Sequence, residues 1–275
     1  MIDYIYKHYD SVASTNDLAK QLINDDCPEG TVLYTDEQTD GKGRSGRVWT
    51  SGKCDSIATS LVLYPTLPED AISCITLVAA LSVRSAIKRF CGLDCQIKWP
   101  NDIVYSNKKI CGILTERIFI DGKSAVIVGI GVNVRNEHFP EELEDKATSI
   151  LKEVLSEKEE MHNILKGDND EAYNDDVVYV LKEGDNTALL HLIWDRFNEY
   201  YDIFVKTGNM ASLVERYNSH LINVGRVVKA DDVMGPIKGV ALGINDNGEL
   251  AISTGKGKMY ISAGEVSVRG LYGYV

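Results

Sequence analysis

The sequence predicts an α+β fold in which a mixed sheet packed with helices is followed by a small all-β domain. Stretches with helical and strand-like patterns alternate up to about residue 220, and from Ile222 only short strand-like runs and turns follow. A change from interleaved elements to strands alone indicates two domains of different class. With 275 residues, 44% of them hydrophobic, the chain can form one large and one small domain, which we place at residues 1–220 and 221–275.

The N-terminal third of the chain begins with a capped helix and continues into strands. Ser14 supplies a capping hydroxyl and Asp17 an acid three positions later, and apolar residues then recur at helical spacing. Residues 31–37 and 56–64 have strand composition, and a polar, glycine-rich segment separates them. A broad apolar stripe over residues 70–90 predicts a long helix.

A hairpin, a second long helix and a β-rich tail complete the pattern. Two apolar runs, residues 110–120 and 124–134, flank Asp121-Gly122, a dipeptide that suits a tight type I′ turn. Apolar residues at helical spacing predict a helix over 187–205. The strand-like runs of the tail, which together are typical of a small barrel, are residues 226–230, 237–244, 250–253, 259–262 and 266–269.

Charge and hydropathy argue against two classes of partner. The net charge is −12, which disfavours a nucleic-acid surface because phosphate binding needs patches of Lys and Arg. No apolar run approaches the length of a membrane span, and the first residues lack the basic and apolar regions of a signal peptide. We therefore expect neither nucleic acid nor a membrane as a partner.

The six cysteines predict reduced thiols rather than disulfides or a metal site. They form no CxxC pair and have no histidine cluster beside them. Cys91 and Cys95 are four positions apart, but two ligands do not make a zinc site. We expect most of these thiols to be small core fillers in a cytoplasmic protein.

Residues 156–185 form an unusually acidic segment. They hold ten acidic residues and three lysines, a net charge of −7, which is more than half of the total of −12. The segment has apolar patches but no sustained period. We interpret it as a solvated insertion between helices, and a specific docking surface is the alternative.

The glycine-rich segment Gly41–Arg47 matches the letters of the dinucleotide-binding fingerprint but lacks its context. That fingerprint needs a helix that opens at its third glycine, whereas here polar residues and then a strand follow Gly46. The segment offers three glycines and the cations Lys42, Arg44 and Arg47. Such a loop can wrap an anionic ligand and become ordered on binding. An ordinary exposed hairpin loop with solubilising charges is the alternative.

The pentapeptide Lys98–Asp102 (Lys-Trp-Pro-Asn-Asp) has the composition of a turn rather than of a core strand. Pro100 has no N–H and disfavours helical geometry in the residue before it, which predicts an extended turn at the end of a strand. A lysine presented there among bulky apolar residues is placed to meet an anion in a partly dry pocket.

Five short motifs occur in an order that resembles biotin–protein ligase, also called biotin–[acetyl-CoA-carboxylase] ligase, of the monofunctional type. They are Ser14-Thr15-Asn16, Glu37-Gln38 leading into Gly41–Arg47 with Trp49, Lys98–Asp102, Gly112-Ile113-Leu114-x-Glu116 and Gly129-Ile130-Gly131-x-Asn133. Each motif alone is weak, but the ordered series is specific and spans roughly residues 10–150. The β-rich tail is similar to the SH3-like C-terminal domain of this family.

The resemblance implies a two-step reaction with biotin and ATP as substrates. The carboxylate of biotin attacks the α-phosphate of ATP, giving biotinyl-5′-adenylate and pyrophosphate. A lysine of a biotin carboxyl carrier protein, part of a biotin-dependent carboxylase, then attacks the mixed anhydride, and AMP leaves. Since no enzyme nucleophile is required, catalysis must come from positioning two anions in a water-poor site. Magnesium (Mg2+) is expected to arrive with ATP, bound by phosphates and water, so no metal ligands are predicted in the chain.

The resemblance also implies the site residues by position. The catalytic cations are Lys98, at the carboxylate and α-phosphate, and Arg44. The biotin-binding residues are Ser14, Thr15, Asn16, Gln38, Lys42, Gly43, Arg44 and Lys98. The residues for ATP or the adenylate are Arg47, Trp49, Asn101, Asn133 and Arg269, with Trp49 stacked on adenine. The alternatives are a strand-end lysine at 98, a core tryptophan at 49, a turn asparagine at 133, and turn caps at Asn101 and Asp102.

The sequence departs from the family pattern in two places, and each departure predicts a difference in function. Position 42 is Lys where many relatives have Arg, so a two-pronged contact becomes a point charge, and we expect looser retention of the adenylate. The stretch before Ser14 leaves no room for the helix-turn-helix with which some relatives repress biotin genes, so we do not expect repression by DNA binding.

Other readings of the chain stay open. A lipoate–protein ligase-like acyl-adenylate transferase would share the fold and the chemistry. A non-enzymatic biotin-binding sensor would require the loop cations to be inert. Exposed sheet edges are compatible with a homodimer.

Overall fold

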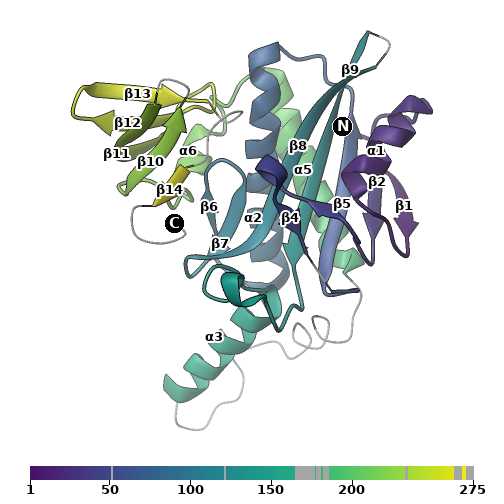
Figure 1. The fold of residues 1–275 in the computed structure, drawn as a ribbon, viewed down its shortest axis with the longest axis horizontal. Coiled ribbons are helices and arrows are strands. Elements are labelled where there is room, and N and C mark those ends of the chain that lie inside the picture. Colours follow the sequence, from purple (N-terminus) through teal and green to yellow (C-terminus); the bar gives the residue numbers. More distant parts are fainter. Residues whose placement is uncertain are drawn as a thin grey trace.

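The computed structural model contains two large sheets joined by helices, and a short two-stranded hairpin (Figure 1). It describes residues 1–50, 52–120, 122–164, 177, 181, 186–232, 235–262 and 268–270. A seven-stranded mixed sheet has the strand order β1-β2-β5-β9-β8-β7-β6, and a five-stranded antiparallel sheet has the order β13-β12-β11-β10-β14. A mixed sheet packed with helices, followed by a small antiparallel unit, confirms the predicted α+β fold class.

The elements have the following bounds. The larger sheet consists of β1 (Ile5–Tyr9), β2 (Thr31–Thr35), β5 (Ser56–Leu63), β6 (Gln96–Lys98), β7 (Asp102–Tyr105), β8 (Lys108–Ile120) and β9 (Lys123–Asn133). The smaller sheet consists of β10 (Val227–Asp232), β11 (Gly235–Ile244), β12 (Leu250–Thr254), β13 (Gly257–Ile261) and β14 (Val268–Gly270). A short separate hairpin is formed by β3 (Gly41–Lys42) and β4 (Val48–Trp49). The described α-helices are α1 (Thr15–Asn24), α2 (Ile75–Cys91), α3 (Ile150–Ile164), α5 (Thr187–Thr207) and α6 (Val214–Asn218).

Local signals placed most of these elements correctly. Ser14 is the N-cap of α1, and its hydroxyl accepts a hydrogen bond from the N–H of Asp17 at 3.5 Å. The apolar runs around Asp121-Gly122 pair as β8 and β9, and Gly122 has a φ of +78°. Five of the described helices and strands were not predicted: β1, the short strands β3 and β4, α3 and α6.

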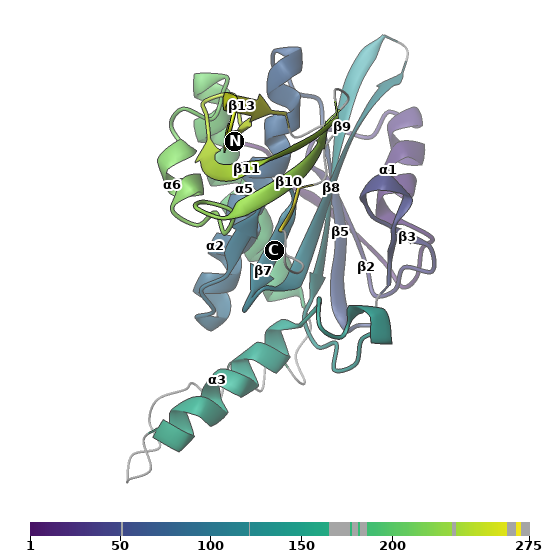
Figure 2. The same ribbon diagram turned by 60° about the vertical axis from the view of Figure 1, so that its left-hand side comes forward.

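Two sequence expectations need correction. One helical stretch, Glu69–Cys91, is long and apolar enough to cross a membrane by length and composition, although no such run was expected. Inside the protein 72% of its apolar window is buried, and α2 packs on α5 and on strands of the larger sheet, as a core helix does. The acidic segment 156–185 is not wholly irregular, because its first residues continue α3, which projects away from both sheets (Figure 2). Most of the rest of that segment lies outside the described residues.

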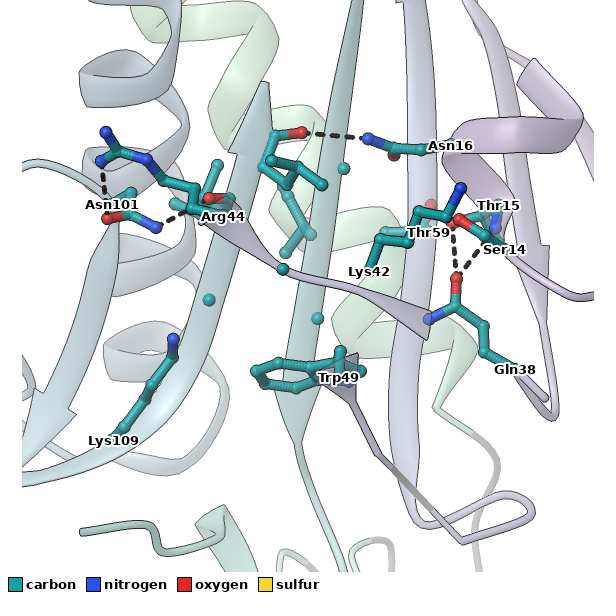
Figure 3. Close-up of a pocket in the computed structure, with 17 residues that line it drawn as sticks. Ser14, Thr15, Asn16, Gln38, Lys42, Arg44, Trp49, Thr59, Asn101 and Lys109 are labelled. Atoms are coloured by element: carbon teal, nitrogen blue, oxygen red, sulfur yellow. Dashed lines mark hydrogen bonds between the residues drawn. The ribbon is translucent and has the colours of Figure 1, made fainter. Parts of the chain in front are cut away.

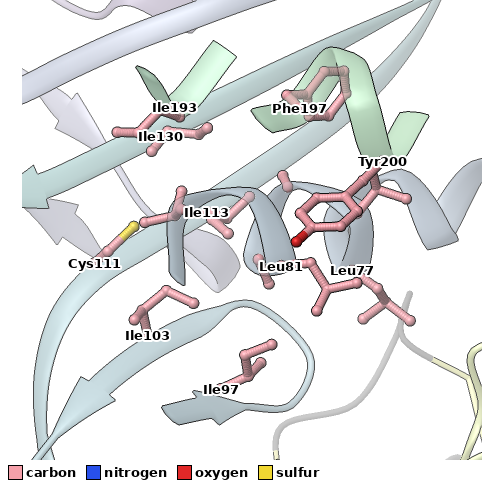
Figure 4. Close-up of a cluster of buried hydrophobic side chains, with 14 of the residues drawn as sticks. Leu77, Leu81, Ile97, Ile103, Cys111, Ile113, Ile130, Ile193, Phe197 and Tyr200 are labelled. Atoms are coloured by element: carbon pink, nitrogen blue, oxygen red, sulfur yellow. The ribbon is translucent and has the colours of Figure 1, made fainter. Parts of the chain in front are cut away.

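The two faces of the larger sheet have different partners. Alternate side chains of β9, from Val126 to Val132, join the main core with α2 and α5 (Figure 4). On the opposite face Ala125 and Ile127 pack with α1 in a smaller cluster. Further along that face the sequence has Gly129 and Gly131 instead of apolar side chains. The sheet surface beside the start of α1 is therefore open to a ligand.

Candidate active site

A pocket of about 450 Å³, including its open mouth, lies on the α1 side of the larger sheet (Figure 3). Its walls come from segments far apart in the sequence. The lining residues are Ser14, Thr15, Asn16, Gln38, Lys42, Gly43, Arg44, Trp49, Thr59, Asn101, Lys109, Gly112, Ile113, Leu114, Gly129, Ile130 and Gly131.

Glycines of β8 and β9 form the floor of this pocket. Gly112 and Gly131 are directly opposite each other in the sheet register, and the ring of Trp49 lies over both. A Cβ on Gly131 would lie 2.6 Å from Cε2 of Trp49, and a Cβ on Gly129 would lie 2.2 Å from Oδ1 of Asn16. No side chain fits at these positions. The glycines let Asn16 and Trp49 approach the sheet backbone.

One end of the pocket is mainly polar, with Lys42 as its one charged lining residue among those described (Figure 3), and hydrogen bonds fix its side chains. The N–H of Thr15 donates to Oε1 of Gln38 at 2.8 Å, and the hydroxyl of Thr15 donates to the same oxygen at 3.1 Å. Asn16 donates through Nδ2 to Oε2 of Glu116 at 2.7 Å and accepts through Oδ1 from the hydroxyl of Ser60 at 2.6 Å. These contacts hold the first turn of α1 as a preset polar wall.

The opposite end of the pocket carries cations (Figure 3). Nη1 of Arg44 donates to Oδ1 of Asn101 at 3.1 Å, and Nδ2 of Asn101 donates to the carbonyl of Ile113 at 2.9 Å. Nζ of Lys109 lies 2.7 Å from Oδ1 of Asp102. Burial lowers the pKa of Arg44, although the nearby carboxylate of Asp102 acts in the opposite direction. Such a lowering marks a partly dry environment in which a cation gains from meeting an anion.

The glycine-rich segment is a small hairpin rather than an open loop. β3 and β4 pair through Gly41–Trp49 and Lys42–Val48, and Ser45 and Gly46 make the turn with φ of +56° and +72°. Lys42 forms an ion pair with Asp17, at the start of α1. The hairpin therefore lies across the pocket and is tied to α1 by charge.

Most of the residues implied for biotin lie together in this pocket. Ser14, Thr15, Asn16, Gln38, Lys42, Gly43 and Arg44 all line it, as do Trp49 and Asn101 from the nucleotide set. Trp49 is thus neither a core tryptophan nor a surface residue: its ring covers the glycine floor.

Lys98, Arg47, Asn133 and Arg269 are not brought into the pocket lining as described. Lys98 is 6% exposed at the end of β6, opposite Asp102, and β6 lies two strands away from β8. Asn133 is buried and donates to the carbonyl of Thr148 at 3.0 Å, so it supports a loop. Arg47 is exposed on the hairpin. The backbone of Arg269 pairs with β10 opposite Lys229, and its side chain lies outside the described structure.

Lys109 is the main site residue that the sequence reasoning missed. It lies in the first part of β8, three positions before Gly112, and lines the cationic end of the pocket. The only signal was its place three residues before a motif glycine, because β8 also contains other charged residues, such as Lys108 and Glu116. The lysine of the pentapeptide drew attention because its surroundings were more unusual.

Among the residues that the structure describes, one group of possible metal ligands lies outside the pocket. The ligand atoms of His8, Asp10 and Asp36, at the ends of β1 and β2, are within 4.8 Å of one another. His8 and Asp10 are exposed, and Nε2 of His8 already lies 2.9 Å from Oδ1 of Asp36. Apart from this contact within the group, no further feature indicates a built metal site.

The sequence of this chain is similar to known biotin ligases. Residues 9–133 match the biotin/lipoate A/B protein ligase family, and residues 224–269 match the biotin protein ligase C terminal domain. The bifunctional ligase/repressor BirA of Bacillus subtilis is 32% identical over 264 residues, which cover 95% of this chain and 73% of that protein. The chain belongs to the biotin/lipoate A/B protein ligase family.

Other similar proteins are biotin ligases rather than lipoate ligases. The biotin–[acetyl-CoA-carboxylase] ligase of Mycobacterium tuberculosis is 26% identical over 95% of this chain and 89% of its own length. The structure of biotin protein ligase from Aquifex aeolicus in complex with biotin and ATP is similar with a TM-score of 0.75 and 28% identity, covering 96% of this chain and 98% of that one. The family and these likenesses support a biotin ligase function, with biotin and ATP as substrates.

Proposed function

We propose that the pocket is the active site of a biotin–protein ligase, in which biotinyl-5′-adenylate is formed and its biotinyl group is then passed to a lysine of a biotin carboxyl carrier protein. The observation that carries the proposal is the two-ended pocket. A fixed polar wall at the start of α1 faces a cationic wall on β8 and the β3–β4 hairpin, and a glycine floor joins them (Figure 3).

The polar end suits the head of biotin. Its cyclic urea carries one carbonyl and two N–H groups, which need donors and acceptors in fixed positions. Ser14, Thr15, Asn16 and Gln38 supply both kinds. Thr15 is hydrogen-bonded to Gln38, Ser60 of β5 contacts Thr15 and Asn16, and Ser14 caps α1. The flat glycine floor leaves space for a ring system beside them.

The cationic end suits the meeting of two anions. An oxygen of the biotin carboxylate attacks the α-phosphorus of ATP, the bond from that phosphorus to the β-phosphate oxygen breaks, and pyrophosphate leaves. Lys109 and Arg44 offset the repulsion between carboxylate and phosphate, in surroundings dry enough to strengthen the effect. We assign to Lys109 the role expected of Lys98, because Lys109 lines the pocket.

The hairpin would protect the intermediate until the carrier arrives. The mixed anhydride is lost if water reaches it, so a cover over the pocket increases the yield of transfer. β3, β4 and Trp49 form such a cover. In the second step the ε-amine of the carrier lysine attacks the acyl carbon, the bond to the phosphate oxygen breaks, AMP leaves, and the amine loses a proton.

We propose that Mg2+ binds together with ATP rather than at a site built from protein side chains. The described residues that line the pocket include no carboxylate, so the lining offers none of the ligands that usually hold this ion. We propose that phosphates and water bind it.

The remaining features stay proposals. We assign the catalytic unit to residues 1–220 and the SH3-like unit to 221–275. The net charge of −12 supports a protein carrier rather than nucleic acid as the partner. A cytoplasmic location and a homodimer stay predictions.

The test is labelling of a purified carrier domain. With Mg·ATP and biotin, the chain should transfer biotin to one carrier lysine and should catalyse biotin-dependent exchange of pyrophosphate into ATP. Replacing biotin by lipoate should abolish both activities. Binding of biotin without exchange or labelling would instead support a sensor, and activity with lipoate would support a lipoate ligase.

A further inference from the structure

A turn of the C-terminal unit docks directly against the catalytic unit. The carbonyls of three successive residues between β11 and β12 each accept one hydrogen bond from that unit. The backbone N–H of Met210 donates to Asp246 at 2.7 Å, the thiol of Cys74 to Asn247 at 3.2 Å, and Nε1 of Trp99 to Gly248 at 3.2 Å. We call residues 246–248 the docking turn.

The docking turn packs tightly against the catalytic unit. Gly248 has a φ of +74°, a conformation that favours glycine. A Cβ there would lie 2.7 Å from Cδ1 of Leu77 and 2.8 Å from Sγ of Cys74, both on the helical segment that leads into and forms α2. The position of the Gly248 carbonyl is therefore closely fixed.

Trp99 is held by the C-terminal unit through both its ring and its backbone. Its side chain is 1% exposed, and its indole N–H has the Gly248 carbonyl as acceptor. Its backbone N–H donates to Oδ1 of Asn223 at 2.9 Å, and Asn223 is itself 1% exposed. A buried N–H that loses its acceptor leaves an unsatisfied donor, so Trp99 is strongly held in place.

Two residues after Trp99 the chain reaches the pocket. Asn101 exchanges hydrogen bonds of 2.9 Å with the backbone of Ile113 on β8, and its Oδ1 accepts from Arg44 at 3.1 Å. The turn that carries Asn101 is therefore fixed by β8 on one side and by Trp99 on the other. The hydrogen bond from Arg44 to Asn101 connects the guanidinium to this turn.

We propose that Trp99 is a positioning residue: through its bond to Gly248, the C-terminal unit fixes the turn of Asn101 and so aims Arg44 at the reacting phosphate. The inference rests on the proposed function of the pocket. It assigns a role in adenylate formation to a side chain that lies outside the pocket lining.

The test is a double-mutant cycle on Trp99 and Gly248. Trp99→Phe keeps the ring but removes the N–H, and Gly248→Ala displaces the acceptor. Each should lower kcat for biotin-dependent pyrophosphate exchange about fivefold, the size of one neutral hydrogen bond. The KM for biotin should change little, because biotin is held mainly at the other end of the pocket. The double variant should lose no more than the worse single variant, since both changes remove the same bond.

Controls separate positioning from loss of stability. Cys74→Ala removes the neighbouring hydrogen bond to the docking turn but leaves Trp99 intact, so its kcat should stay at the wild-type value. All rates are normalised to the folded fraction from urea unfolding. A multiplicative loss in the double variant, an unchanged kcat in Trp99→Phe, or an equal loss in Cys74→Ala each overturns the inference. Lys109→Met tests the proposed function separately: if it is fully active, the pocket assignment fails, whatever Trp99 does.

Discussion

Nζ of Lys109 lies 2.7 Å from a carboxylate oxygen of Asp102 and 5.6 Å from the centre of a Trp49 ring. The carboxylate and the ring hold a cation at the wall of the pocket, on the same side as Arg44. Asp102 belongs to the pentapeptide that made Lys98 conspicuous. Asn101 and Asp102, the last residues of the pentapeptide, contact side chains that line the pocket, whereas Lys98 is not among the described lining residues.

We predict that Lys109→Met lowers the rate of adenylate formation by about 100-fold or more, because a cation that stabilises charge in the transition state is lost. Lys98→Met is the matched control, since it removes the same charge two strands away. It should change the rate less than about threefold. Pyrophosphate exchange measures both. If the two results are reversed, Lys98 is the catalytic lysine.

Gly131→Ala should displace Trp49, because the new methyl group would lie 2.6 Å from the ring. If overpacking of about 1–3 kcal/mol weakens the contact of Trp49 with the nucleotide, the KM for ATP should rise by about 5- to 150-fold. Gly255→Ala is the control, since a Cβ there meets nothing within 4 Å. Steady-state exchange at varied ATP compares them. An unchanged KM in Gly131→Ala would show that the ring does not contact the nucleotide.

Lys42→Arg should slow release of the adenylate. A guanidinium makes two parallel hydrogen bonds to a phosphate where an ammonium acts as a point charge. The wild-type lysine also has Asp17 as an alternative partner at the pocket rim. Release of radiolabelled adenylate from both proteins gives the answer, and identical rates contradict the prediction.

His220 should make the free energy of unfolding depend on pH. Burial, and next to it the charge of Arg84, lowers the pKa of His220 below its usual value of 6.5. Between the lowered value and 6.5 the unfolded chain binds more protons, so stability falls as pH falls through this window and levels off below it. His220→Gln should flatten this part of the profile in urea titrations. A slope that is unchanged in the variant would assign the effect to other groups.

Thiol reactivity should distinguish Cys54 from the other five cysteines. Cys54 is exposed, whereas Cys27, Cys74, Cys91, Cys95 and Cys111 are buried. A thiol reagent added to the native protein should therefore modify one thiol quickly, and all six should react in denaturant. Cys54→Ser should remove the fast phase. A fast phase of two or more thiols would mean that a buried cysteine opens readily.

Sequence reasoning placed the elements whose signals are local. The cap at Ser14 and the turn at Asp121-Gly122 are set by neighbouring residues, and both were located correctly. β1 was missed because its sequence, Ile-Tyr-Lys-His-Tyr, has little alternation between buried and exposed positions and depends on pairing with β2.

Site residues could be predicted where they are neighbours in one motif. They could not be predicted where their position depends on which strands pair in the folded protein. Ser14, Thr15 and Asn16 lie on one helical turn and reach the pocket together. The choice between Lys98 and Lys109 depends on the strand order β8-β7-β6, which is not visible in either motif. Asn133 follows a motif glycine closely, yet its side chain turns to Thr148 instead of the ligand space.

The length of the turn between β8 and β9 fixes the register of these strands, and so determines which residues form the floor of the pocket. Gly112 faces Gly131 only because the strands are in the register that starts at Ile120 and Lys123, beside the turn. A slip of one residue would turn Ile130 and Val132 toward the ligand and the glycines toward the core. One inserted or deleted residue at Asp121-Gly122 should therefore abolish substrate binding, although neither residue is among those that line the pocket.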